Sequence, residues 1–94
     1  MTGNSLRHTV TITNPQGFHM RPIQAFVAVA NRFAGTVTVM RPGNPAPVNG
    51  KSMLHLMSLG AEQGHELVIQ ITGPGAAEIL AALVEVFERN YDDE

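Results

Sequence analysis

The sequence contains no cysteine, which excludes disulfide scaffolds, thiolate metal sites and cysteine nucleophiles. It also has no excess of basic residues, because six Lys and Arg stand against eight Asp and Glu, for a formal net charge of -2. Binding to nucleic acid or anionic lipid favours a broad positive surface, so neither class of partner is expected. No apolar run approaches the roughly 20 residues that cross a bilayer, and residues 1–6 do not resemble a signal peptide. We therefore expect a cytoplasmic protein that is not inserted in a membrane.

The length of 94 residues fits one small domain and leaves no room for a second. Hydrophobic residues make up 44 % of the chain, which argues against disorder. We predict a single domain over residues 1–94, with its core at about 7–88 between a short N-terminal extension and an acidic C-terminal tail.

The spacing of apolar residues predicts four strands and three helices. Alternating polar and β-branched residues indicate a strand over 7–13, and apolar residues at helical spacing indicate a helix through 23–33, which Gly35 would end. Later segments are predicted as strands over 36–40 and 66–72 and as helices over 52–59 and 76–89. The stretch 46–49 is predicted as an edge strand, since Pro45 and Pro47 cannot donate hydrogen bonds within a ladder.

The predicted order of elements is therefore βαββαβα, which indicates the α+β class. We expect a two-layer, open-faced sandwich, in which three helices cover one face of a four-stranded antiparallel sheet. The order of the strands within that sheet stays open at this point.

A histidine, His19, stands where the loop after the first predicted strand becomes a helix. The first turn of a helix has backbone N–H groups without intrahelical partners and the positive end of the dipole, so it can hold an anion attached to a nearby side chain. Neutral imidazole is the form that attacks a phosphoryl group, and the dipole and the cation of Arg21 both disfavour the imidazolium. Arg21 could also donate charge-assisted hydrogen bonds to phosphate oxygens. The arrangement therefore suits a histidine that carries phosphate.

Two points about this site stay open. Pro22 fits the first turn of a helix, either at the first helical position or two residues further in. A histidine at a helix start is also commonly a cap or a surface residue, so the local arrangement alone is not specific.

Two segments of the chain resemble the signatures of the HPr family. The first matches the order Gly, apolar residue, His, variable residue, Arg, Pro, and it reads Gly17-Phe18-His19-Met20-Arg21-Pro22. The second is similar to a Lys-Ser pair that opens a short helix, followed by an apolar run that ends in Gly, and it reads Lys51-Ser52-Met53-Leu54 and Met57-Ser58-Leu59-Gly60. Two motifs at the family's separation are far more specific than either alone.

The resemblance implies a phosphoryl carrier. His19 would accept a phosphoryl group on Nδ1 from phosphorylated Enzyme I and donate it to Enzyme IIA domains in sugar uptake. Arg21 would stabilise the phosphate and Pro22 would stand at the helix start. Such a protein is a cosubstrate and not a stand-alone enzyme, and it needs no cofactor and no metal. A monomer is expected, because transient transfer requires a free docking face.

Ser52 matches the serine that HPr kinase/phosphorylase modifies in many members of the family, and the modified form could bind a transcription regulator. Ser52 is also a natural N-cap, and both roles can hold together. A phosphate here would place about two negative charges beside Met53, Leu54 and Met57 and would impair an apolar docking surface.

A surface for partner proteins is expected around the histidine, since flexible thioether side chains suit a surface that fits several partners in turn. Its expected members are Phe18, Met20, Lys51, Met53, Leu54 and Met57. Core packing is the alternative for one or two of them. Met20 is bulkier than the residue usual in the family, and the proline-rich segment 41–48 is longer, so both features bear on partner choice.

Other functions remain open. The relay could serve nitrogen or metabolic regulation instead of sugar uptake. The protein could also be a regulatory module switched at Ser52, or an unrelated ligand-binding domain in which His19 only caps a helix. The remaining histidines, His8, His55 and His65, have no ligand spacing and no carboxylate cluster beside them, so no zinc site is predicted.

Overall fold

The computed structural model describes residues 5–89, apart from the side chains of residues 44 and 45. Its elements follow the predicted order βαββαβα and are β1 (Ser5–Thr11), α1 (Met20–Ala30), β2 (Thr36–Arg41), β3 (Asn44–Asn49), α2 (Met53–Met57), β4 (Glu66–Thr72) and α3 (Ala76–Glu88). The acidic tail predicted after α3 and residues 1–4 of the N-terminal extension lie outside the described residues.

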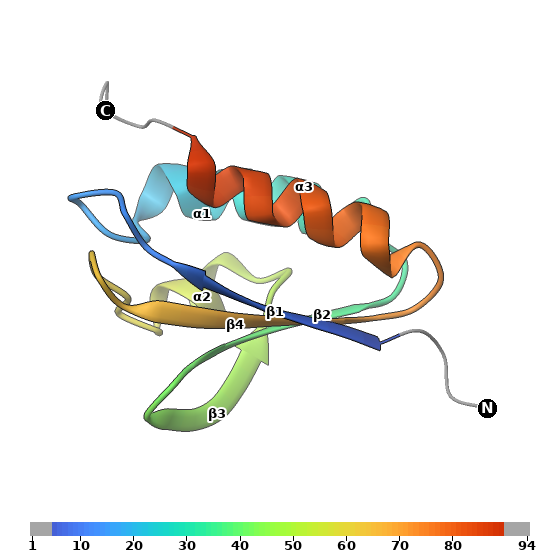
Figure 1. Cartoon of the computed structure of the whole chain (residues 1–94), viewed down its shortest axis with the longest axis horizontal. Helices are drawn as coiled ribbons and strands as arrows, with labels where there is room; N and C mark the ends of the chain where they lie inside the picture. Colours follow the sequence, from blue (N-terminus) through green and yellow to red (C-terminus); the bar gives the residue numbers. More distant parts are fainter. Residues whose placement is uncertain (1–4, 90–94) are drawn as a thin grey trace.

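The four strands form one antiparallel sheet in the order β1-β4-β2-β3. β4 is paired on both sides, with Leu67 opposite Val10 of β1 and Ile71 opposite Val37 of β2. α1 and α3 lie side by side over one face of this sheet (Figure 1), and α2 contacts α1 and β3. The predicted open-faced sandwich is confirmed.

The core lies between the sheet and the helices because the strands alternate buried and exposed residues. Leu67, Ile69 and Ile71 of β4 are fully buried, whereas Val68 and Gln70 between them are half-exposed on the open face. The helices contribute the other half of the core, chiefly Ile23, Phe26, Val29, Ala30, Leu83 and Val86. One face of the sheet is thus packed and the other faces solvent.

The strand predicted over 7–13 ends at Thr11, because the ladder with β4 ends there, at the pair Thr11 and Glu66. Ile12 continues the contact outside the ladder, since its N–H donates to His65 O (2.9 Å) and its C=O accepts from Gly64 N–H (2.8 Å). The end of β1 is therefore fastened to the loop that precedes β4.

The first helix begins and ends earlier than the apolar pattern 23–33 indicated, since α1 spans Met20–Ala30. Phe33 is buried although it lies beyond the helix, because a turn in which its N–H donates to Ala30 O (3.1 Å) returns its ring to the core. Pro22 is the third residue of α1, which settles the register that the sequence left open.

The predicted edge strand is confirmed: β3 lies at the end of the sheet and begins at Asn44, two residues before the prediction. Its pairing with β2 is irregular between Val39 and Arg41, where the register shifts. Among the described helices, none is both long and apolar enough to cross a bilayer.

Candidate functional site

His19 is the N-cap residue of α1, with an extended backbone conformation (φ -107°, ψ -162°). Its carbonyl accepts the first intrahelical hydrogen bond, from Ile23 N–H at 2.9 Å. Its side chain is half-buried and makes no hydrogen bond that caps the helix within the described chain. The ring is therefore held at the helix entrance without being used as a cap.

Gly17 fixes the path of the chain into the site. Its φ is +77°, and a Cβ atom there would lie 2.7 Å from the carbonyl oxygen of Ala61. Phe18 N–H donates to that same oxygen at 3.0 Å, so the approach to α1 is bound to the loop after α2. Only a residue without a side chain can pass here at this distance.

Phe18 is buried, with 6 % of its surface exposed, which favours the alternative of core packing over contact with partner proteins. Its ring packs against Phe26 of α1 (centroids 5.9 Å apart) and Phe87 of α3 (5.1 Å). Three aromatic rings thus join the loop before His19 to both long helices. This packing supports the position of the neighbouring imidazole.

The first turn of α1 is suited to an anion. Pro22 has no N–H to donate, so the N–H groups of Met20 and Arg21 are those that lack intrahelical partners in this turn. This turn contains no acidic residue that would compete with a phosphate, and the exposed Arg21 follows His19 by two residues. The dipole, two amide donors and the exposed Arg21 side chain therefore belong to the same turn of the helix.

Asn14 contacts the histidine ring, a contact that the sequence did not reveal. Its Nδ2 lies 3.0 Å from His19 Nε2, while its Oδ1 accepts from Gln16 N–H at 3.3 Å. The sequence had indicated only that Asn14 belongs to a turn. Its position five residues before the histidine, inside that turn, is the signal from which the contact could have been suspected.

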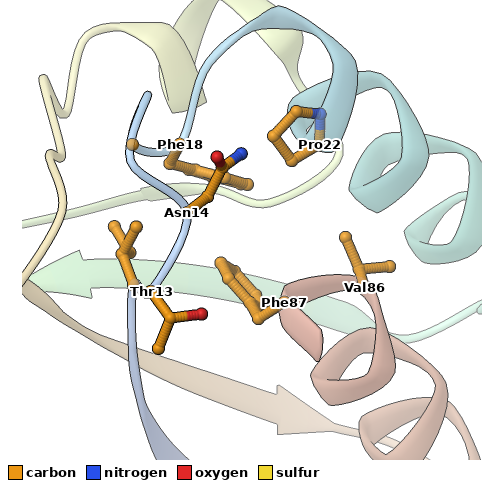
Figure 2. A pocket seen from close by; sticks show the side chains of 8 residues that line it. Thr13, Asn14, Phe18, Pro22, Val86 and Phe87 are labelled. Carbon is orange, nitrogen blue, oxygen red and sulfur yellow. The ribbon is translucent and has the colours of Figure 1, made fainter. Parts of the chain in front are cut away.

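A small cavity lies between the beginning of α1 and the end of α3 (Figure 2). Its volume is about 10 Å³, and its walls are mostly apolar, from Ile12, Thr13, Asn14, Gly17, Phe18, Pro22, Val86 and Phe87. A space of this size holds about one water molecule and no metabolite. A ligand-binding site at this place is therefore disfavoured.

Exposed apolar side chains are found on α1 and α2. Leu54 is 76 % exposed, Met57 47 % and Met20 44 %, whereas Met53 is half-buried and packs against the core. The two helices contact each other. Three of the residues expected to meet partner proteins are thus accessible, and Met53 is shared with the core.

Lys51 has a structural role that the sequence did not indicate. Its Nζ donates to the carbonyl oxygens of Phe33 and Gly35, the latter at 2.8 Å, and its side chain is half-buried. It thereby ties the turn before α2 to the segment between α1 and β2. The expected contact of Lys51 with partner proteins stays a prediction beside this structural role.

Ser52 is the N-cap of α2, as the sequence predicted. Its Oγ accepts from His55 N–H at 3.2 Å, and the residue is half-buried. Its phosphorylation stays a prediction.

The remaining histidines are dispersed. His8 and His55 are exposed on β1 and α2. His65 Nδ1 accepts from Glu62 N–H at 2.8 Å, and its Nε2 lies 3.2 Å from Nη2 of Arg41. Within residues 5–89, no three His, Asp or Glu side chains gather in a way that could hold a metal ion.

Known proteins resemble this chain over nearly its whole length. The sequence model described as "PTS HPr component phosphorylation site" matches residues 6–89. The chain is 39 % identical over 85 residues to the phosphocarrier protein HPr of Pseudomonas aeruginosa, covering 89 % of this chain and 92 % of that protein. It is 28 % identical over 90 residues to the phosphocarrier protein NPr of Escherichia coli, covering 96 % and 99 %.

A solved structure shows the same fold. The crystal structure of HPr-C-His from Thermoanaerobacter tengcongensis superimposes with a TM-score of 0.83 at 32 % identity, covering 95 % of this chain and 98 % of that one. The matched region includes the helix entrance that holds His19. The chain therefore belongs to the HPr family of phosphocarrier proteins of the phosphotransferase system.

Proposed function

We propose that His19 accepts a phosphoryl group from phosphorylated Enzyme I and donates it to an Enzyme IIA domain in sugar uptake. The observation that carries this proposal is the position of the imidazole at the N-cap of α1, where it does not cap the helix. An N-cap side chain lies beside the unpaired amides of the first turn, so a phosphate on the ring would be close to them.

The first turn would stabilise the phosphorylated state. The N–H groups of Met20 and Arg21 and the positive end of the helix dipole would face the phosphate oxygens, and the Arg21 guanidinium would add charge-assisted donors. These groups would stabilise the phosphate once it is on His19. The partner protein would supply the phosphoryl donor. No metal and no cofactor enter this scheme.

The protein would act as a carrier and not as a stand-alone enzyme. The cavity behind the site is too small for a metabolite, so the second reactant would be another protein that covers His19. Met20, Leu54 and Met57 offer that protein exposed apolar contacts. The carrier would work in the cytoplasm as a monomer, so that the docking surface is free for each partner in turn.

Mass analysis after incubation with phosphoenolpyruvate and Enzyme I tests the proposal. We expect one acid-labile phosphoryl group on the wild-type protein and none on His19→Ala. His8→Ala and His55→Ala are matched controls, because both residues are exposed and lie on other elements, and both variants should be phosphorylated like the wild type. Phosphate on His19→Ala would refute the assignment.

A second candidate function is regulation through Ser52, which a kinase of the HPr kinase/phosphorylase type would modify. The supporting observation is that Ser52 caps a short helix that carries the exposed Leu54 and Met57. A phosphate there would change the charge of the docking surface without touching His19. Acid-stable phosphate at Ser52 after incubation with ATP and such a kinase would support this role.

A further inference from the structure

The side-chain amide of Asn14 is held between a turn and the histidine ring. Asn14 O accepts from Gly17 N–H at 2.8 Å, and its side-chain Oδ1 accepts from Gln16 N–H at 3.3 Å. Its Nδ2 is left to face His19 Nε2 at 3.0 Å. Figure 2 shows the amide directed toward the first turn of α1, between Phe18 and Pro22.

This orientation decides which nitrogen of the ring carries the proton. An amide nitrogen only donates hydrogen bonds, so Nε2 must accept through its lone pair. A neutral imidazole has one N–H proton, which then lies on Nδ1. In that tautomer, Nδ1 has no lone pair with which to attack phosphorus.

We propose that Asn14 is a positioning residue that gates phosphoryl transfer at His19 by selecting the tautomer of the ring. The inference rests on the proposed function, in which Nδ1 accepts the phosphoryl group. With Nδ2 toward the ring, the site is closed to transfer. When the side-chain amide rotates by half a turn, Oδ1 takes the place of Nδ2 beside the ring and accepts a hydrogen bond from Nε2–H. The ring proton is then on Nε2, and Nδ1 has a lone pair.

The incoming step requires the turned amide. The Nδ1 lone pair forms the N–P bond, while the bond between phosphorus and the donor breaks and leaves its electron pair on the donor. The ring then carries the phosphoryl group on Nδ1, a proton on Nε2 and one positive charge. Oδ1 of Asn14 stabilises this cation by accepting its N–H.

The outgoing step depends on the same proton. When the N–P bond breaks, its electron pair returns to Nδ1, and the ring leaves as neutral imidazole only if Nε2 has kept its proton. With Nδ2 of Asn14 toward the ring, Nε2 has no proton, and the ring would have to leave as the anion. The resting orientation therefore preserves the phosphorylated carrier, and the turned orientation releases the group.

Both orientations are accessible, because the hydrogen bond that holds the amide is long. Gln16 N–H to Oδ1 is 3.3 Å, beyond the usual 2.7–3.2 Å range for such bonds, so its loss costs less than that of a short bond. A docked partner that donates to Oδ1 or excludes water from the loop would change the relative populations of the two orientations of the Asn14 amide.

Asn14→Asp tests the gate, because a carboxylate has the shape of the amide and only accepts. Asp can keep the turn with Gln16 N–H, and its second oxygen then accepts from Nε2–H. Asn49→Asp is a matched control: Asn49 Oδ1 accepts from Lys51 N–H at 2.9 Å in the same kind of turn, away from His19. Each variant adds one negative charge.

The first measurement is the NMR chemical shift of the two ring nitrogens of unphosphorylated protein, in the pH range where His19 is neutral. We expect the proton on Nδ1 in the wild type and in Asn49→Asp, and on Nε2 in Asn14→Asp. A wild-type ring protonated on Nε2, or the same tautomer in wild type and Asn14→Asp, would overturn the proposal. Enzyme I is not needed, so this result stands apart from the test of the proposed function.

The second measurement is the rate at which the phosphorylated protein loses phosphate to water. The protein is loaded chemically with phosphoramidate, which forms the N–P bond and releases ammonia, and the phosphorus NMR signal absent from His19→Ala is followed. We expect several-fold faster loss from Asn14→Asp than from the wild type and Asn49→Asp. Equal rates in all three would overturn the gate.

Discussion

Gly17 shows how one residue determines the approach to the site. Both its positive φ and the nearby carbonyl oxygen of Ala61 disfavour a side chain at this position. Other glycines of the chain share the positive φ, whereas the contact with Ala61 belongs to Gly17. Gly43 separates the two effects, since its φ is +93° but a Cβ atom there would meet nothing within 4 Å.

We expect Gly17→Ala to lower the free energy of unfolding by about 1–3 kcal/mol, because it combines backbone strain with a clash against backbone atoms. Gly43→Ala carries only the strain and should cost less. Denaturant unfolding of both variants measures the difference. An equal loss of unfolding free energy in the two variants would show that the backbone at Ala61 shifts to accommodate the added methyl group.

A substitution of Arg21 should weaken the binding of phosphate without lowering the stability of the protein. Its side chain is exposed, so Arg21→Gln should leave the free energy of unfolding nearly unchanged. The loss of charge-assisted hydrogen bonds to phosphate, worth about 1.5–3 kcal/mol, should slow transfer from Enzyme I by roughly 10- to 100-fold.

Rapid-mixing measurements of phosphoryl transfer check this prediction, with Arg32→Gln as the control. Arg32 is also exposed but follows the other end of α1. Arg21→Lys should recover part of the rate, because an ammonium keeps the charge but not the planar pair of donors. A normal rate in Arg21→Gln would contradict the role given to the guanidinium.

At the scale of elements, α2 is capped by Ser52 and carries the exposed Leu54 and Met57 of the proposed docking surface. Ser52→Ala removes the acceptor for His55 N–H and should lower the free energy of unfolding by about 1 kcal/mol. Ser52→Asp keeps an N-cap oxygen but places a charge near Leu54 and Met57. We expect this variant to be folded and slower in accepting phosphate from Enzyme I.

Steady-state and rapid-mixing assays of the two Ser52 variants distinguish capping from docking. Ser52→Ala should transfer phosphate at nearly the wild-type rate below its melting temperature. Transfer to Ser52→Asp at the unmodified rate would refute the proposed effect of the charge.

The elements differ in how well the sequence predicted them. β4 was predicted with its observed bounds, because Leu67, Ile69 and Ile71 alternate with residues of the open face. The start of α1 was misplaced, because the first turn carries exposed Met20 and Arg21 and so adds nothing to the apolar stripe. Strand order depends on pairing between distant segments, which local pattern does not encode.

The candidate site was predictable in part for the same reasons. The motif around His19 lies in one short segment, so the sequence displays it directly. The contacts of Phe18 with Phe87, and of Lys51 with Phe33, join segments far apart in the chain. The sequence therefore predicts both residues as members of the partner surface and shows neither the aromatic packing of Phe18 nor the carbonyl contacts of Lys51.

At the scale of the whole molecule, the net charge affects the rate at which partner proteins encounter the carrier. The formal net charge is -2, and the basic residues on and just after α1 are Arg21 and Arg32. Long-range attraction to an acidic partner should therefore be weak.

We expect the rate of transfer from Enzyme I to fall only slightly as salt increases, by less than roughly tenfold between about 0.05 and 0.5 M, because screening acts on few charges. Transfer rates measured across this range, with unfolding followed under the same conditions, check the prediction. A steep fall would mean that charged contacts dominate the encounter.

Lys51 is the single lysine of the chain, and its ammonium group is bound to two carbonyl oxygens. An amine-reactive reagent can thus modify one lysine side chain in this protein, and its reaction should be faster when the turn before α2 separates from the segment after α1. The labelling rate of that amine, followed by mass spectrometry, would report local opening at the docking helix without any engineered probe.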